Sequence, residues 1–391
     1  MSDLDILKRS LKPEQLQPKK KEEGNDIWDM LEGTVIDTEQ GRIFKTSFRF
    51  PFGHKVGKHA VQEPGIHELI LKWARIADHE FTAQDILFLD TETTGLAGGT
   101  GTLVFMAGLG FIEDNAVVIE QYFLPDPAAE RGFLEHVVMR ARNFKVITSF
   151  NGKSFDTNLL ETRCIMQKID FSWRSIPHID LLPLARRLWK HHLESCALES
   201  LEYYILGSMR DSSQDIWGGH IPQVYFHYLD TRNAEEIVNI FNHNRSDILS
   251  MPVLLHLISD ELSFPDTRRM HTEIDLFAVG RLYEDMGFTK VAADIYEYLL
   301  SDENASAAKQ LSFLYKRELQ LEKALKLWEM AAEKGELYAI RELAVFCEHS
   351  GKNAEKALEW VEKALELLES AADSKAILDW MKRKERLLKK Q

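Results

Sequence analysis

An apolar run that ends in two closely spaced acids is the feature that most restricts how this chain folds. Residues 86–89 predict a buried strand, and Asp90 and Glu92 follow at its end. Side chains two residues apart on a strand point to the same face, so these carboxylates stand side by side where they lose water. Such a pair needs a proton, a basic partner or a hard cation such as Mg²⁺ or Mn²⁺. Taken alone, the pair is more often a strand-to-turn junction whose acids face water.

A further acid follows a second predicted strand. Residues 145–150 predict a buried strand, and the turn signal Asn151–Gly152 comes directly after it. Ser154 is a candidate N-cap for the next helix, which puts Asp156 in that helix's first turn. Because an acid in a first turn also stabilises a helix through its dipole, Asp156 alone does not identify a site.

The third acid lies on a long amphipathic helix. Apolar residues recur at helical spacing between Ile237 and Leu254, and this stretch carries His243 and Asp247. Residues four apart share one face of a helix, and such a pair alone is more often a surface hydrogen bond. In chain order with the two earlier motifs, the pair becomes an acid and a candidate base for metal-dependent hydrolysis.

This order of motifs resembles the DEDD exonucleases of the ribonuclease H-like fold over roughly residues 81–260. Residues 90–96, 149–156 and 178–189 are similar to the YprB family, which joins such a nuclease domain to helical repeats and includes a bacterial DNA-repair exonuclease. The resemblance implies two divalent ions, Mg²⁺ or Mn²⁺, with four metal ligands and one base: Asp90, Glu92, Asp156, Asp247 and His243. Four residues beside the first two motifs are candidate substrate-binding residues, Lys153 foremost: Thr93, Thr94, Asn151 and Lys153.

The spacing of the base departs from the family pattern. The histidine branch of these enzymes has five residues' separation between base and final Asp, and the tyrosine branch has four. Here His243 precedes Asp247 by four residues, and Asn242 stands where the ordinary histidine would be. A neutral His can take a proton from water near pH 7. His243 is therefore either the base or a residue that only orients the water.

The chemistry follows from the charge of a phosphodiester, which repels hydroxide. Two divalent ions about 3.5–4 Å apart activate water and stabilise the leaving oxygen. We expect Asp90 to bridge the two ions. The resemblance implies 3′→5′ polarity with release of a mononucleotide.

The net charge of −14 argues against a broad nucleic-acid surface, so any nucleic-acid track must be local. Besides Lys153, its candidates are Arg140, Arg142 and the basic cluster at 186–192, although a solvated helix face is the commoner reading of each. The odd, unpatterned cysteines, Cys164, Cys196 and Cys347, indicate reduced thiols and a cytoplasmic protein. No run approaches a membrane span, and no membrane partner is expected.

Four segments are expected. Residues 1–33 predict a flexible tail, and residues 34–80 predict a small β-containing segment and linker with a hairpin. Residues 81–262 predict an α/β ribonuclease H-like nuclease domain, a mixed sheet flanked by helices. Residues 273–391 predict an all-α tetratricopeptide-like solenoid, because a small-then-large pattern starts at Ala292, Ala324 and Ala357. Residues 377–388 would cap the stack, which either binds a partner or serves as a spacer or dimerisation element.

Three functions compete. The favoured one is a DNA exonuclease of repair, for which the resemblance suggests a helicase as co-worker. The second keeps the site but takes RNA, since the ligand set does not encode the sugar. The third is a catalytically idle scaffold that works through its helical repeats.

Overall fold

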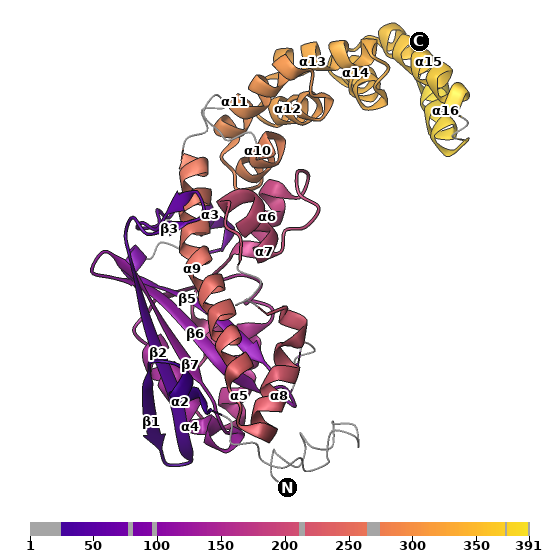
Figure 1. Cartoon of the computed structure of the whole chain (residues 1–391). Helices are drawn as coiled ribbons and strands as arrows, with labels where there is room; N and C mark the ends of the chain where they lie inside the picture. Colours follow the sequence, from indigo (N-terminus) through magenta and orange to yellow (C-terminus); the bar gives the residue numbers. More distant parts are fainter. Residues whose placement is uncertain are drawn as a thin grey trace. The chain divides into compact units, whose positions relative to one another are not determined.

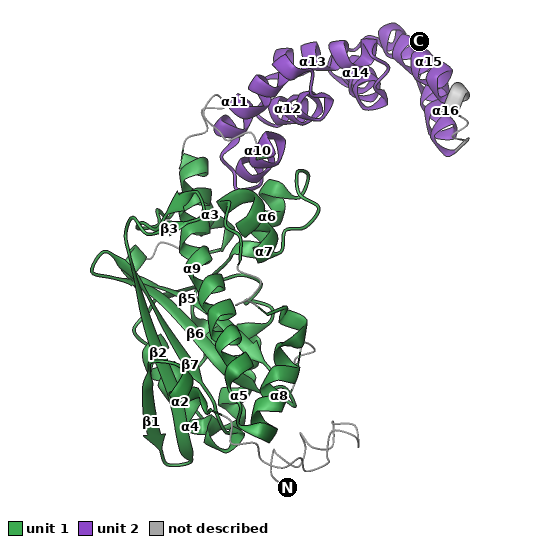
Figure 2. Ribbon diagram, in the orientation of Figure 1, with its two compact units in different colours: residues 1–264, 271–274 green, residues 265–270, 275–391 purple. Residues whose placement is uncertain are grey.

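The computed structural model describes residues 25–76, 81–95, 100–210, 216–263, 274–371 and 374–389. The chain divides into two units (Figure 2), residues 1–264 with 271–274 and residues 265–270 with 275–391. Residues 1–24 of the predicted tail and residues 96–99 lie outside the described residues. None of the described helices is long and apolar enough to cross a membrane.

A mixed sheet of seven strands forms the first unit (Figure 1). Its spatial order is β1-β2-β7-β6-β5-β8-β9, in which β5, β8 and β9 run parallel and the other neighbours are antiparallel. The strands are β1 (Thr34–Thr38), β2 (Gly41–Pro51), β5 (Ile86–Thr93), β6 (Val104–Glu113), β7 (Ala116–Phe123), β8 (Val146–Ser149) and β9 (His178–Asp180). A separate two-stranded sheet pairs β3 (Lys55–Val56) with β4 (His59–Ala60). The carboxyl ends of β5, β8 and β9 therefore meet at one edge.

The predicted hairpin belongs to this sheet. Strand β2 pairs with β7 from Phe44 opposite Phe123 to Pro51 opposite Ala116. The domain boundary expected at residue 81 therefore falls inside one continuous sheet. The predicted tail is also too long, because Ile27 of α2 (Ile27–Met30) is fully buried and Tyr228 donates to Asp26 Oδ1 at 2.5 Å.

Helices cover both faces of the sheet. Helix α9 (Glu235–Ser263) packs over β5, β6 and β7. A Cβ built on Gly108 would lie 2.0 Å from Ile248 Cδ1 and 2.2 Å from Asn244 Oδ1, so only glycine lets α9 approach β6 this closely. On the opposite face, the Arg140 guanidinium of α4 (Glu130–Ala141) lies 4.0 Å from the Phe111 ring centroid. The predicted α/β architecture is confirmed.

Aromatic packing holds a further helix of the first unit against the sheet. Tyr225 of α8 (Ile221–Thr231) stacks on Phe105 with ring centroids 4.0 Å apart, and its hydroxyl donates to Leu124 O at 2.9 Å. The described helices that complete the unit are α3 (Glu68–Trp73), α5 (Asp156–Met166), α6 (Leu181–Trp189), α7 (Leu198–Leu201) and a π-helical turn η5 (Glu202–Leu206).

The second unit is helical throughout its described residues, as predicted. It comprises α10 (Leu276–Asp285), α11 (Thr289–Leu299), α12 (Ala305–Arg317), α13 (Leu321–Glu333), α14 (Leu337–His349), α15 (Ala354–Ala371) and α16 (Ser374–Leu388), each packed on the next. Ala292, Ala324 and Ala357 are all fully buried, so their small side chains lie where helices approach. The assignment to tetratricopeptide-like repeats stays a prediction.

Candidate active site

The carboxyl end of β5 carries two of the candidate ligands. Asp90 and Glu92 point to the α9 side of the sheet, where Asn244 Nδ2 donates to Asp90 Oδ2 at 2.7 Å. Glu92 is buried, and Asp90 is half-buried. Thr91 points to the other face, where its hydroxyl donates to Asp156 Oδ1. One strand tip therefore contacts both other candidate elements.

The loop after β8 brings Asp156 to this tip. Asn151 adopts a left-handed φ of 68°, and a Cβ on Gly152 would lie 2.8 Å from Asp156 Oδ2. The helix α5 begins at Asp156, in its first turn as predicted. The predicted N-cap Ser154 is wrong, because Phe155 takes the N-cap position and the Ser154 hydroxyl instead donates to Asn151 O at 3.3 Å.

Asp180 holds that loop in place. Its carboxylate caps α6 by accepting from Leu182 N at 3.1 Å. It also accepts from Asn151 N at 2.8 Å and from Lys153 N at 3.2 Å. Asp180 is thus a positioning residue for the loop.

Helix α9 supplies the last acid and the candidate base. The His243 Nε2 atom lies 3.8 Å from Asp247 Oδ2, as the four-residue spacing predicts. Arg210 donates to Asp247 Oδ1 and lies 3.0 Å from His243 Nδ1. Its Nε also donates to Glu202 Oε2 at 2.5 Å, while Ser250 donates to the other Glu202 oxygen at 2.6 Å. One guanidinium therefore bridges both α9 residues and a buried acid.

The Arg210 contact sets the tautomer of His243. A guanidinium only donates hydrogen bonds, so Nδ1 must accept and the proton of the neutral ring lies on Nε2. In this arrangement His243 offers a donor toward Asp247, and its Nε2 holds no free lone pair for a proton from water.

The charges of the four acids act on one another. Burial raises the pKa of Asp90 well above its usual range, and the carboxylates of Asp247, Glu92 and Asp156 raise it further. Burial likewise raises the pKa of Glu92 to about 8 and that of Asp156 to about 6. His243 and Arg210 oppose the shift at Glu92, and the Thr91 hydrogen bond opposes it at Asp156. The acids form one electrostatic cluster that added positive charge would stabilise.

The donor chemistry fits a hard cation, although the ligands are not yet arranged around one. Among the described residues, no three His, Cys, Asp or Glu side chains stand in positions that could hold a metal ion. Three of the four acids are engaged by donors of the chain itself: Asn244, Thr91 and Arg210. Carboxylate oxygens are the ligands that Mg²⁺ and Mn²⁺ prefer. Full use of Asp247 as a ligand requires Arg210 to release it.

The candidate substrate-binding residues lie around the same edge. The Thr93 hydroxyl donates to Gly95 O at 2.9 Å, and Thr94 Oγ1 accepts from Leu103 N at 2.9 Å. Both therefore shape the end of β5. Asn151 and Lys153 are exposed on the loop before Asp156.

Sequence reasoning missed four residues of this region. Arg210 and Glu202 lie outside any periodic pattern, and nothing in the sequence connects them with Asp247. Asn244 and Gln121 form a buried relay, in which Gln121 Nε2 donates to Asn244 Oδ1 at 2.8 Å. The position of Asn244 beside His243 was the one available signal.

Two other basic candidates have structural contacts instead. Arg140 pairs with Glu120 at 3.1 Å, and Arg142 donates to Asp170 O at 2.7 Å. Neither contact involves a residue of the acid cluster.

Comparison with known proteins identifies the class first. Residues 87–259 match the family model RNase_H_2 of the RNase_H superfamily, so the first unit carries a ribonuclease H-like nuclease domain. The chain is also 31% identical over 333 residues to "Uncharacterized protein YprB" of Bacillus subtilis (strain 168), across 81% of this chain and 78% of that protein. The chain belongs to the YprB family, as the motif resemblance indicated.

A solved structure is similar at a lower level. The family B DNA polymerase from the hyperthermophilic archaeon Pyrobaculum calidifontis aligns with 65% of this chain and 33% of its own, at 16% identity and a TM-score of 0.34. The chain thus spans about a third of that polymerase, a likeness too low to bear on function.

Proposed function

We propose that this protein is a DEDD-type 3′→5′ exonuclease that hydrolyses the phosphodiester bonds of DNA with divalent metal ions. The observation that carries the proposal is the single electrostatic cluster of Asp90, Glu92, Asp156 and Asp247, drawn from a strand tip and two helices. Acids held this close in a buried setting are unfavourable unless positive charge joins them. A ribonuclease H-like domain supplies the class of reaction, which is nucleic-acid hydrolysis.

Four residues would hold two Mg²⁺ or Mn²⁺ ions: Asp90, Glu92, Asp156 and Asp247. When bound, the ions supply an activated water and stabilise the leaving oxygen. The carboxylates of all three other acids raise the pKa of Asp90, which supports its role as the shared ligand. Asn244 orients its carboxylate from α9.

His243 would act once Arg210 releases it. With Nδ1 freed from the guanidinium, the ring can carry its proton on Nδ1 and accept one from water at Nε2. If the present tautomer persists, His243 can only orient the water through its Nε2 hydrogen. His243 would therefore act as the base when Arg210 has released Nδ1, and would only orient the water when Arg210 is bound there.

The remaining assignments follow from the family and the fold. Thr93, Thr94, Asn151 and Lys153 would contact the substrate at the edge where β5 and β8 end. The helical repeats would bind a protein partner, for which the family resemblance suggests a helicase in cytoplasmic DNA repair. The alternative substrate is RNA, because carboxylates and ions do not distinguish the sugar.

The test is incubation of the full chain with end-labelled DNA and RNA, single- and double-stranded, in Mg²⁺, Mn²⁺ or EDTA. We expect mononucleotide release from the 3′ end of DNA in either metal and none in EDTA. Asp90→Asn and Asp247→Asn should each lower turnover by more than about 100-fold, the upper effect of residues that only support a ligand. Asp230→Asn, an exposed acid of α8, is the matched control.

Two outcomes would overturn the proposal. Near wild-type activity of either Asn variant with added Mn²⁺ would remove the metal assignment. Absence of any metal-dependent hydrolysis would favour the scaffold. Faster hydrolysis of RNA than of DNA would keep the site and change the substrate.

A further inference from the structure

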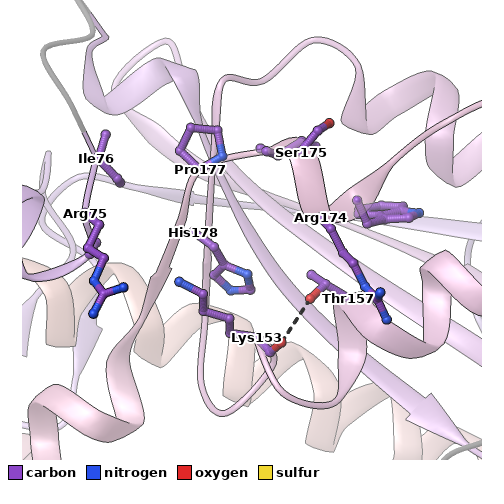
Figure 3. A pocket seen from close by; sticks show the side chains of 11 residues that line it. Arg75, Ile76, Lys153, Thr157, Arg174, Ser175, Pro177 and His178 are labelled. Carbon is purple, nitrogen blue, oxygen red and sulfur yellow. Dashed lines mark hydrogen bonds between the residues drawn. The ribbon is translucent and has the colours of Figure 1, made fainter.

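A basic pocket lies beside the candidate active site. It has a volume of about 440 Å³, and its charged lining side chains are Arg75, Lys153 and Arg174 (Figure 3). No Asp or Glu is among the described residues that line it. Its size falls in the range of roughly 300–1,000 Å³ typical of ligand pockets. In a chain of net charge −14, such a concentration of cations is a local exception.

One segment of the chain, residues 152–157, contributes both to the pocket and to the acid cluster. Lys153 and Thr157 line it, and Asp156 lies between them in the chain. Gly152, which precedes Lys153, is the residue whose Cβ would lie 2.8 Å from Asp156 Oδ2. The loop that positions Asp156 therefore also lines the pocket.

The cations are held by an ordered framework. Asp180 accepts from Lys153 N at 3.2 Å, and Asn158 Nδ2 donates to Lys153 O at 3.2 Å. The Arg174 Nε donates to Asn158 Oδ1 at 2.9 Å, so Asn158 ties the two basic residues together. The hydrogen bond to Asn158 orients the Arg174 guanidinium, and the contacts of Lys153 fix its backbone beside it.

The His178 ring, which also lines the pocket, adds no charge. His178 is buried and its Nε2 lies 2.7 Å from Ser149 Oγ. Burial, aided by the Lys153 ammonium, lowers the pKa of His178 to about 3, so the ring is neutral near pH 7. The positive charge of the pocket comes from its Lys and Arg side chains.

We propose that this basic pocket binds the phosphodiester backbone of the strand next to the bond being hydrolysed. The inference rests on the proposed exonuclease function and adds a subsite to it. The acid cluster repels every phosphate that is not on an ion, so the neighbouring phosphates need cations of their own. Arg and Lys are the usual partners of such phosphates, and single-stranded backbones bind in basic grooves.

The test measures binding separately from hydrolysis. The wild type, Lys153→Gln, Arg174→Gln and the double variant are titrated with short fluorescein-labelled single-stranded DNA in EDTA, at several salt concentrations. We expect Kd of the double variant to rise by about tenfold or more. The slope of log Kd against log salt concentration should fall by about 1.4, because each lost phosphate contact removes about 0.7. A strand with neutral methylphosphonate linkages near its 3′ end should bind the wild type and the double variant alike.

The control is Arg131→Gln, which removes an exposed charge of α4 that pairs with Glu135. Thermal melting of each variant checks that it is folded. An unchanged Kd and salt slope in the double variant would overturn the pocket while leaving the exonuclease proposal intact. Pocket-dependent binding without metal-dependent hydrolysis would support the pocket and refute the exonuclease.

Discussion

Arg210 Nη1 lies 3.0 Å from His243 Nδ1, and the same guanidinium donates to Asp247. A cation this close to the acid cluster competes with a metal ion for the same carboxylate. Arg210→Gln should therefore tighten Mn²⁺ binding by about tenfold or more, since the Arg210 side chain is only 11% exposed and a charge pair at this range interacts by a few kcal/mol near a protein surface. Titration calorimetry measures the affinity.

The variant Arg210→Lys is the matched control, because it keeps the charge and loses the fork of donors. Its Mn²⁺ affinity should stay near that of the wild type. Both variants should melt at a lower temperature in EDTA, since Glu202 is buried and loses its bond from Arg210 Nε. Weaker Mn²⁺ binding by Arg210→Gln would show that Arg210 assists the ion instead of competing with it.

Asn244 is fully buried and connects Gln121 to the Asp90 carboxylate. Asn244→Ala should lower metal affinity or turnover by about 10–100-fold, as expected when a residue that orients a ligand is lost. It should also lower the free energy of unfolding by about 1–3 kcal/mol, because Gln121 is left with an unpaired donor. Asn239→Ala on the same helix is the control, and equal activities of the two variants would remove the orienting role.

The close contact between β6 and α9 leads to a further testable prediction. Gly108→Ala would force Asn244 and Ile248 outward, because the added Cβ would lie 2.0–2.2 Å from their side-chain atoms. We expect a loss of about 1–3 kcal/mol of stability from overpacking and a larger fractional loss of activity, as Asp247 moves with the helix. Urea unfolding and turnover measure the two effects. Gly218→Ala, where nothing lies within 4 Å of a built Cβ, should change neither.

Glu92 makes the metal-free protein sensitive to pH. Its carboxyl binds a proton more tightly in the folded state, with a pKa of about 8 against 4.5. The free energy of unfolding in EDTA therefore falls as the pH rises from about 4.5 to about 8, by an amount on the order of a few kcal/mol. Glu92→Gln should flatten this dependence and be more stable than the wild type at pH 8.

Urea unfolding from pH 5 to 8 in EDTA tests this, with the exposed Glu236→Gln as control. Added Mn²⁺ should restore the free energy of unfolding of the wild type at pH 8, because the ion takes the place of the proton. Parallel curves for the wild type and Glu92→Gln would show that burial does not perturb this carboxyl.

Local patterns predicted the parts of the site that depend on periodicity. The alternation of a strand put Asp90 and Glu92 on one face, and the helical spacing of four put His243 beside Asp247. Both rules act within a few residues, so the sequence alone contains them. The helical second unit was predictable for the same reason.

Contacts between distant segments were not predictable in the same way. Arg210 meets Asp247 across 37 residues, and Thr46 donates to Gln121 across 75. Such pairs form only when the sheet and α9 are already in place, so no local pattern encodes them. The Ser154 N-cap failed for a related reason, since the loop's hydrogen bonds to Asp180 fix where α5 begins.

The pairing of β2 with β7 has a practical meaning for anyone who trims this protein. In a fragment starting at residue 81, the long and fully buried strand β7 would become an edge strand with unpaired backbone amides. Such edge strands pair with strands of other molecules and lead to aggregation. The hairpin at 34–51 thus covers the edge of β7 in the nuclease unit. A shortened version of that unit should therefore include the hairpin.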